Sequence, residues 1–194
     1  KQQVITIGGE YLFSAKTKIK VEGAMSNYDV NLFSAKDKAN DKGYAAKLQF
    51  QNSDTKIKLF SKALLMQTNL GYEFVQGRFR PLERLRNVEY LRDWSLPFAV
   101  NKADEHITNA SVKVADSKGN FYAYEIINYK RSDNFNGIRQ QIDNYTVSKG
   151  WKFTNKISFT TTNSQNDNGT YFRPTIDISK ELSKIKKLQV GINY

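Results

Sequence analysis

The feature of this sequence that most restricts its fold is the regular alternation of apolar and polar residues. In residues 150–162, for example, Trp151, Phe153, Ile157 and Phe159 alternate with lysine, threonine and serine. Successive side chains of an extended chain point to opposite sides, so each such stretch has one apolar and one polar face as a strand. On a helix the same apolar residues would be spread around the circumference. The pattern therefore predicts amphipathic β-strands.

Short polar stretches with turn-forming residues separate these strands, as at residues 116–120 and 148–150. Strands joined by such turns form hairpins, and successive hairpins form an antiparallel up-and-down meander. We expect an all-β, barrel-like fold of about ten long strands, or eleven if residues 55–76 hold two, in a single β domain over residues 1–194, which is either processed or a fragment of a longer chain. The expected strands cover residues 3–14, 18–34, 43–52, 55–66, 68–76, 107–116, 120–132, 135–147, 150–163, 170–180 and 187–194.

Residues 77–106 depart from this pattern and form an arginine-rich insertion that contains five of the eight arginines of the chain. Apolar residues recur every third position within 82–91, so we expect one short helix or an irregular crossing near 78–94. Arginine binds phosphate and carboxylate groups in a bidentate manner. The cluster could therefore hold lipid phosphates or the acidic surface of a partner, or could instead pair with the acidic residues interleaved with it, which is the interpretation we favour. The candidate anion- or partner-binding residues are Arg78, Arg80, Arg84, Arg86 and Arg92.

Residues that carry catalysis or bind metals are scarce. The chain has no cysteine and a single histidine, His106, and it contains no Gly-rich phosphate loop and no zinc-protease, serine-hydrolase or EF-hand motif. Asp104 and Glu105 precede His106, but neighbouring side chains of an extended chain point to opposite faces, so we interpret His106 as a loop residue. We expect no enzymatic activity, no catalytic residue, no metal site and no cofactor.

The chain is strongly basic, with a net charge of +11. Such a charge is typical either of a protein that binds polyanions or of a lysine-rich solvated surface. The lysines are spread through nearly every segment, which favours the second interpretation. Tyr122, Tyr124, Tyr129 and Lys130 could stack on nucleic-acid bases if they were exposed together, but no nucleic-acid-binding signature is present and we consider this partner unlikely.

The apolar face of each strand must be covered by a second sheet, by helices or by lipid. Few helices are expected, and several strands reach the roughly 9–11 residues that a tilted membrane strand needs. The polar positions carry long side chains suited to a wet interior, and aromatic residues often lie near strand ends, where they could form interfacial girdles. The polar rows are Lys47, Gln49 and Gln51, and Lys56, Lys58 and Lys62; the girdle candidates are Tyr11, Phe13, Tyr28, Phe33, Tyr44, Tyr145 and Trp151.

This arrangement resembles that of bacterial outer-membrane β-barrel proteins. Residues 18–29, a polar turn and residues 43–51 are similar to their strand-turn-strand units, and residues 188–194 resemble their C-terminal signal, in which apolar residues alternate up to an aromatic last residue, here Tyr194. The resemblance implies a non-enzymatic barrel, or a segment of one, that serves transport, assembly or surface scaffolding in the bacterial outer membrane or at the cell surface. Its partners would be outer-membrane lipid and other envelope proteins. The alternative is a soluble β-sandwich or β-sheet domain of a secreted or surface protein that binds glycan or protein.

Overall fold

The computed structural model describes residues 1–29, 41–59, 62–96, 102–165, 167–182 and 187–193. These residues form one antiparallel sheet of ten strands and one helical turn. The elements are β1 (Gln2–Ser14), β2 (Thr17–Tyr28), β3 (Lys42–Leu59), β4 (Lys62–Val75), α1 (Tyr90–Asp93), β5 (Glu105–Ala115), β6 (Phe121–Arg131), β7 (Asn136–Ser148), β8 (Trp151–Asn163), β9 (Asn168–Glu181) and β10 (Lys187–Asn193).

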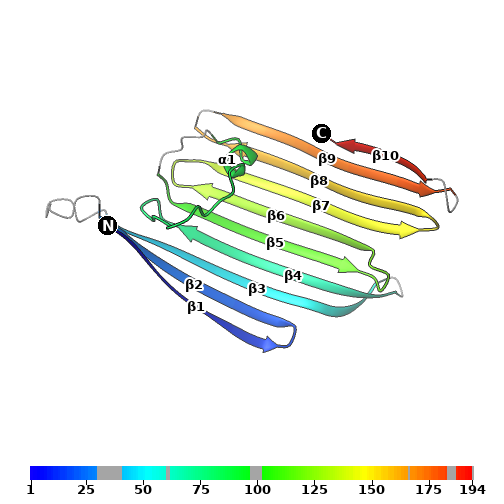
Figure 1. The fold of residues 1–194 in the computed structure, drawn as a ribbon, viewed down its shortest axis with the longest axis horizontal. Helices are drawn as coiled ribbons and strands as arrows, with labels where there is room; N and C mark the ends of the chain where they lie inside the picture. The colour runs from blue at the N-terminus through cyan, green and yellow to red at the C-terminus, as the bar shows by residue number, and fades with distance from the viewer. Residues whose placement is uncertain (30–40, 60–61, 97–101, 166, 183–186, 194) are drawn as a thin grey trace.

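Each strand pairs with the next one in the sequence, so the sheet order is β1 to β10 without a crossover (Figure 1). The prediction of an all-β up-and-down meander is confirmed, and α1 lies inside the predicted insertion. Among the described residues β1 and β10 form the two free edges, and the sheet is open rather than closed into a barrel. Residues 30–34 of the strand expected at 18–34, and Tyr194 of the terminal signal, lie outside the described residues.

The prediction was wrong for residues 43–76. We expected a turn near residue 53 and then either one strand or two in residues 55–76. Instead, two long strands, β3 and β4, cover residues 43–75 and pair along their length. The polar residues after Asn52 form a β-bulge instead of a turn, with a register shift up to Thr55 and a positive φ of 53° at Asp54. Cross-strand contacts hold the bulge, since Lys16 Nζ donates to the carbonyl oxygen of Asp54 at 2.8 Å. Turn-forming residues suit both structures, and the sequence pattern does not separate them.

The register divides the sheet into two faces of opposite character, because residues paired across antiparallel strands point to the same side. We call the side that carries Gln141 the polar face and the side that carries Ile142 the apolar face. Lys47, Gln49 and Gln51 lie on the polar face as expected. Because of the bulge, the even-numbered Lys56 and Lys58 lie on the same face as the odd-numbered residues before it. Lys62, which pairs with Leu59, lies on the apolar face instead.

The aromatic residues follow the expected girdles only in part. Tyr11, Tyr44 and Trp151 are exposed on the apolar face, and the exposed Phe13 packs edge-on against Tyr11. Tyr145 lies on the polar face instead, because the β6–β7 register places it opposite Phe121. There, Tyr145 stacks on Phe121. Tyr28 pairs with Gln2 and also lies on the polar face, which corrects its expected place, and Phe33 lies outside the described residues.

Among the described residues, burial of hydrophobic side chains is confined to one end of the polar face. The described residues with buried hydrophobic side chains are Phe79, Trp94, Tyr129 and Phe135, and the last three pack together there. In the part of the chain that the structure describes, no second layer covers the apolar face. No described helix is long and apolar enough to cross a membrane.

Candidate functional site

The described residues between β4 and β5, 76–96 and 102–104, fold back over the polar face, and we call them the arginine segment. It lies at the end of the sheet where the N-terminus lies (Figure 1). Two glycines allow it to approach the sheet closely. A Cβ at Gly43 would overlap the backbone of Arg78 and Phe79, and a Cβ at Gly137 would lie 2.6 Å from Cε3 of Trp94. The sheet is thus free of side chains at both positions where the segment touches it.

The first contact is polar. The backbone N–H of Arg80 donates to Ser26 Oγ at 2.9 Å, and Ser26 is fully buried under the segment. Gln2 Nε2 donates to the carbonyl oxygen of Pro81 at 2.9 Å. Side chains of β1 and β2 therefore hold the start of the segment by its backbone, which leaves the arginine side chains available for other contacts.

The second contact is aromatic. Trp94 follows α1, is 1% exposed, and packs edge-on against Tyr129 with ring centroids 5.4 Å apart. Tyr90 and Phe135 also pack on Tyr129, and the guanidinium of Arg139 lies 5.3 Å from the Trp94 ring centroid. Burying an aromatic side chain of this size stabilises the packed state by about 1.5–3 kcal/mol, so this cluster fixes the far end of the segment.

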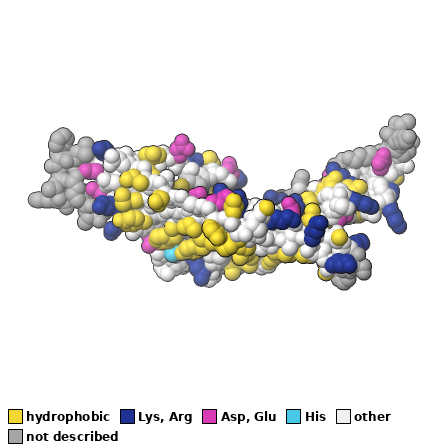
Figure 2. Space-filling model, turned by 90° about the horizontal axis from the view of Figure 1, so that it is seen from below, with side chains coloured by type: hydrophobic (Ala, Val, Ile, Leu, Met, Phe, Trp, Pro, Cys, Tyr) yellow, Lys and Arg dark blue, Asp and Glu magenta, His cyan; other side chains and the backbone are white. Residues whose placement is uncertain are grey.

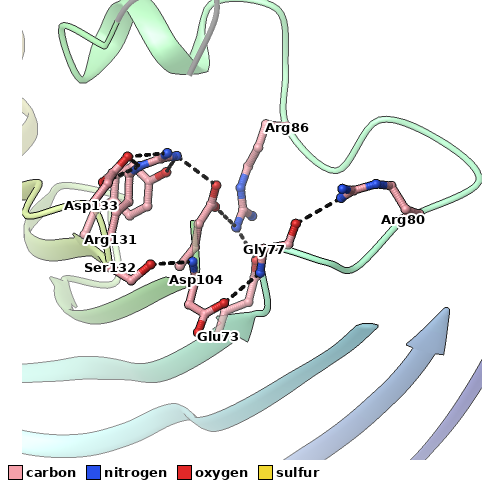
Figure 3. A network of polar contacts seen from close by, with 10 residues as sticks. Glu73, Gly77, Arg80, Arg86, Asp104, Arg131, Ser132 and Asp133 are labelled. Atoms are coloured by element: carbon pink, nitrogen blue, oxygen red, sulfur yellow. Dashed lines mark hydrogen bonds and ion pairs between the residues drawn. The ribbon is translucent and has the colours of Figure 1, made fainter. Parts of the chain in front are cut away.

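Between the two contacts lies a network of ion pairs (Figure 3). Arg86 of the segment reaches Glu73 of β4 at 2.5 Å and Glu105 of β5 at 3.4 Å. Glu105 also contacts Arg131 of β6 at 3.3 Å, and Arg131 makes a bidentate pair with Asp133 that includes a 2.8 Å contact. The side chain of Arg131 is 1% exposed, so the carboxylates of Glu105 and Asp133 offset the cost of burying its positive charge.

The pKa values of two groups in the segment reflect this setting. Burial lowers the pKa of Arg86, but the hydrogen bond and the charge of Glu73 outweigh burial, and the pKa stays above its ordinary value. Burial raises the pKa of the Tyr90 hydroxyl well above its ordinary value. At neutral pH Arg86 is therefore positively charged and Tyr90 is neutral beneath it, with the guanidinium 5.1 Å from the ring centroid.

A pocket of about 520 Å³ opens between the arginine segment and the sheet. Its cationic lining residues are Arg80, Arg84, Arg86, Lys102 and Arg131, and Glu105 is the one carboxylate among the described residues that line it. Its apolar wall is formed by Phe79, Pro81, Leu85, Val88 and Leu91. The arrangement can bind a group that is negatively charged and partly apolar.

The structure brings three of the five predicted arginines together at this pocket. Arg80, Arg84 and Arg86 line the pocket, whereas Arg78 and Arg92 are exposed residues of the segment that do not line it. Arg86 is paired with acids, whereas Arg84 has no carboxylate partner among the described residues, and anion or partner binding by the cluster stays a prediction. The two acids that pair with Arg86 come from strands β4 and β5, and not, as the favoured interpretation expected, from the acidic residues interleaved in the segment.

Sequence reasoning missed four basic residues of this site, namely Lys102 within the segment and three arginines that adjoin it. Lys102 and Arg131 line the pocket, Arg139 packs on Trp94, and Arg173 lies 4.0 Å from Asp93. One signal was present, since arginine is much rarer than lysine in this chain and the three arginines outside the segment were left unexplained.

The other sequence candidates do not assemble into a site. His106 was expected in a loop, but β5 begins at Glu105, and His106 pairs with Lys130 and contacts the Tyr72 hydroxyl at 2.7 Å on the apolar face. Glu105 points to the opposite face, as expected. Tyr129 is buried on the polar face, whereas Tyr122 and Tyr124 are exposed on the apolar face, so the stacking group is divided. Within the described residues no group of three or more His, Cys, Asp or Glu side chains could hold a metal ion.

Comparison with known proteins gives no relative: no protein-family model, no curated protein and no solved structure matches this chain.

Proposed function

We propose that this chain forms part of the wall of a bacterial outer-membrane β-barrel and that it serves transport, assembly or surface scaffolding without catalysis. The apolar face would contact outer-membrane lipid, and the polar face, with the arginine segment, would face water. The observation that supports this proposal is the uncovered apolar face, which extends over the whole ten-stranded sheet.

The exposure of this face is large. Ile7 on the edge strand β1 is 79% exposed, Ile142 on β7 is 51% exposed and Phe172 on β9 is 57% exposed, so the exposure is not limited to one edge of the sheet. Hydrophobic side chains form a broad exposed band in Figure 2. Soluble monomers rarely expose contiguous apolar patches larger than a few hundred Å², roughly. Lipid covers such a face without a second protein layer, which is why we favour the membrane.

The dimensions agree with this environment. Strands β1 to β9 contain 11 to 18 residues, and a membrane-spanning strand needs about 9–11. Exposed Tyr11, Tyr122 and Trp151 lie on the apolar face near the hairpin turns at one end of the sheet. Aromatic residues at this level are typical of the boundary between lipid and water.

One observation favours a second candidate function. The described sheet is open, and β1 and β10 each have a partner strand on one side only. A soluble β-sheet domain of a secreted or surface protein would have such a sheet with its apolar face against another protein layer. Under the membrane proposal these edges would pair with further strands or with other envelope proteins.

Folding with and without detergent separates the two functions. We expect a β-type circular dichroism spectrum and one discrete species in size-exclusion chromatography only in detergent, together with a change of gel mobility on boiling. A monodisperse, β-rich monomer in plain buffer would refute the membrane proposal and favour the soluble domain.

A pair of neighbouring substitutions gives a sharper test. Ile142→Arg places a charge on the apolar face at the middle of β7, and Gln141→Arg places the same charge on the polar face one residue away. In a bilayer the first should cost about 2–4 kcal/mol, and the second should stay within about 0.5 kcal/mol of the wild type. Equal effects in lipid vesicles would contradict the assignment of the faces.

A further inference from the structure

All eight arginines of the chain gather at one place, although lysines are spread over the whole sheet. Five are in the arginine segment. The others lie on three different strands, and each adjoins the segment: Arg131 through the Glu105 pair with Arg86, Arg139 through the Trp94 ring, and Arg173 through Asp93. Arginine differs from lysine in its planar fork, which binds carboxylate and phosphate groups by two parallel hydrogen bonds.

The pocket contains more positively charged side chains than the carboxylates of the described residues compensate. Arg86 and Arg131 are compensated by Glu73, Glu105 and Asp133. Arg80, Arg84 and Lys102 also line the pocket, and none of them has a carboxylate partner among the described residues. Arg80 Nη1 donates only to the carbonyl oxygens of Gly77 and Phe79, at 3.0 and 2.9 Å. Three cations are thus available to a ligand.

We propose that this pocket binds an organic anion, in which a phosphate or carboxylate group contacts Arg80, Arg84 and Lys102 and an apolar body packs on the wall formed by Phe79, Leu85 and Val88. The compensated pair of arginines holds the walls of the pocket in place, and the uncompensated cations supply the binding energy. A small inorganic anion would use the charges but not the apolar wall, so it should bind more weakly than an anion with an aromatic ring.

The position of the pocket extends this inference and rests on the proposed function. The pocket lies on the polar face, which would be the water-filled side of a barrel wall. Solutes that pass along this face would meet a local excess of positive charge, which raises the local concentration of anions and lowers that of cations. The proposal concerns the pocket itself and holds for a soluble sheet as well.

The test uses isothermal titration calorimetry on the whole chain, in whichever medium gives the folded protein. The probes are phenyl phosphate, benzoate, inorganic phosphate and the neutral compound phenol. We expect saturable binding of phenyl phosphate or benzoate, weaker binding of inorganic phosphate and none of phenol. The two organic probes distinguish a phosphate ligand from a carboxylate ligand. Binding should weaken as salt is added, because salt screens exposed charges.

Matched variants locate the site. Arg84→Gln removes an uncompensated charge from the pocket and should weaken binding at least about tenfold, since hydrogen bonds between charged groups are among the stronger ones. Arg92→Gln removes an exposed charge of the same segment outside the pocket and should change the affinity less than about twofold. Lys102→Gln serves as a second pocket variant if Arg84→Gln does not fold, which circular dichroism would reveal.

Two results would overturn the inference. Absence of saturable binding by the folded wild type would show that the pocket takes no such anion. Equal weakening by Arg84→Gln and Arg92→Gln would show that the net charge of the segment, and not the pocket, attracts anions. Neither result bears on the barrel, because the folding experiments decide that question separately.

Discussion

Replacing Gly137 by alanine tests whether Trp94 fastens the arginine segment to the polar face. The added Cβ would lie 2.6 Å from Cε3 and 2.7 Å from Cζ3 of Trp94, whereas carbon atoms in contact are about 3.5–4.0 Å apart. The indole would have to move by about 1 Å. Because Trp94 is 1% exposed and packs on Tyr129, that movement disturbs the whole aromatic cluster.

The expected loss follows from two opposing effects. Overpacking of this kind costs about 1–3 kcal/mol, and replacing glycine by alanine in compatible extended backbone restores about 0.4–1 kcal/mol. We therefore expect Gly137→Ala to lower the free energy of unfolding by about 1–2 kcal/mol. Urea titration measures the loss, and a Trp151→Phe background makes Trp94 the sole tryptophan, so its emission reports directly on the contact.

Gly9→Ala is the matched control, because Gly9 is also a strand glycine and a Cβ there would meet nothing within 4 Å. This variant should be as stable as the wild type or slightly more stable. If Gly137→Ala behaves in the same way and the emission of Trp94 does not change, then Trp94 does not pack on Gly137 and the second contact of the segment is wrong.

Three further predictions concern the same end of the sheet. Gly43→Ala should cost more than Gly137→Ala, at the upper end of about 1–3 kcal/mol, because its Cβ would overlap the backbone of Phe79, which moves less easily than a side chain; urea titration compares the two. Glu105→Gln should cost about 1–3 kcal/mol by weakening the pairs of Arg86 and the buried Arg131, and an unchanged midpoint would contradict the network. The hydrogen bond from Arg131 holds the pKa of Asp133 below its ordinary value of 3.8. This pair therefore stabilises the folded state above about pH 4, and its contribution is lost as the pH falls through the lower folded pKa. The difference in stability between wild type and Asp133→Asn should be present at pH 7 and shrink toward pH 2, and an equal difference at both pH values would argue against the pair.

The sequence predicts the local parts of this fold well. Alternation depends only on neighbouring residues, so it locates most strands and their two faces, and the turns at 116–120 and 148–150 lie where expected. It fails at residues 52–55, where the same polar residues form a bulge within β3 instead of a turn. Whether such residues bend a strand or end it depends on the partner strand, which local pattern does not contain.

The candidate site was predictable only where it is local in sequence. The arginines of the segment are close together in the chain, so the sequence alone indicates them as candidate anion- or partner-binding residues. Arg131, Arg139 and Arg173 join them through the register of β6, β7 and β9, which no short motif encodes. The partner acids Glu73 and Glu105 are likewise brought together by the β4–β5 pairing.

The arginine segment lies on the polar face, opposite the face that lipid or another protein layer would cover. If lipid covers the apolar face, the segment lies on the side that remains in water, where uncompensated charges such as that of Arg84 are tolerated. If a protein layer covers it, the pocket is unchanged, because its walls come from the polar face and the segment alone. Ile142→Arg therefore tests the environment of the sheet and Arg84→Gln tests its ligand. Since the two residues lie on opposite sides, with one in the middle of β7 and the other in the segment, their effects on stability and on binding should be independent. A loss of anion binding in Ile142→Arg at unchanged folding would show that the two faces are coupled, contrary to this division.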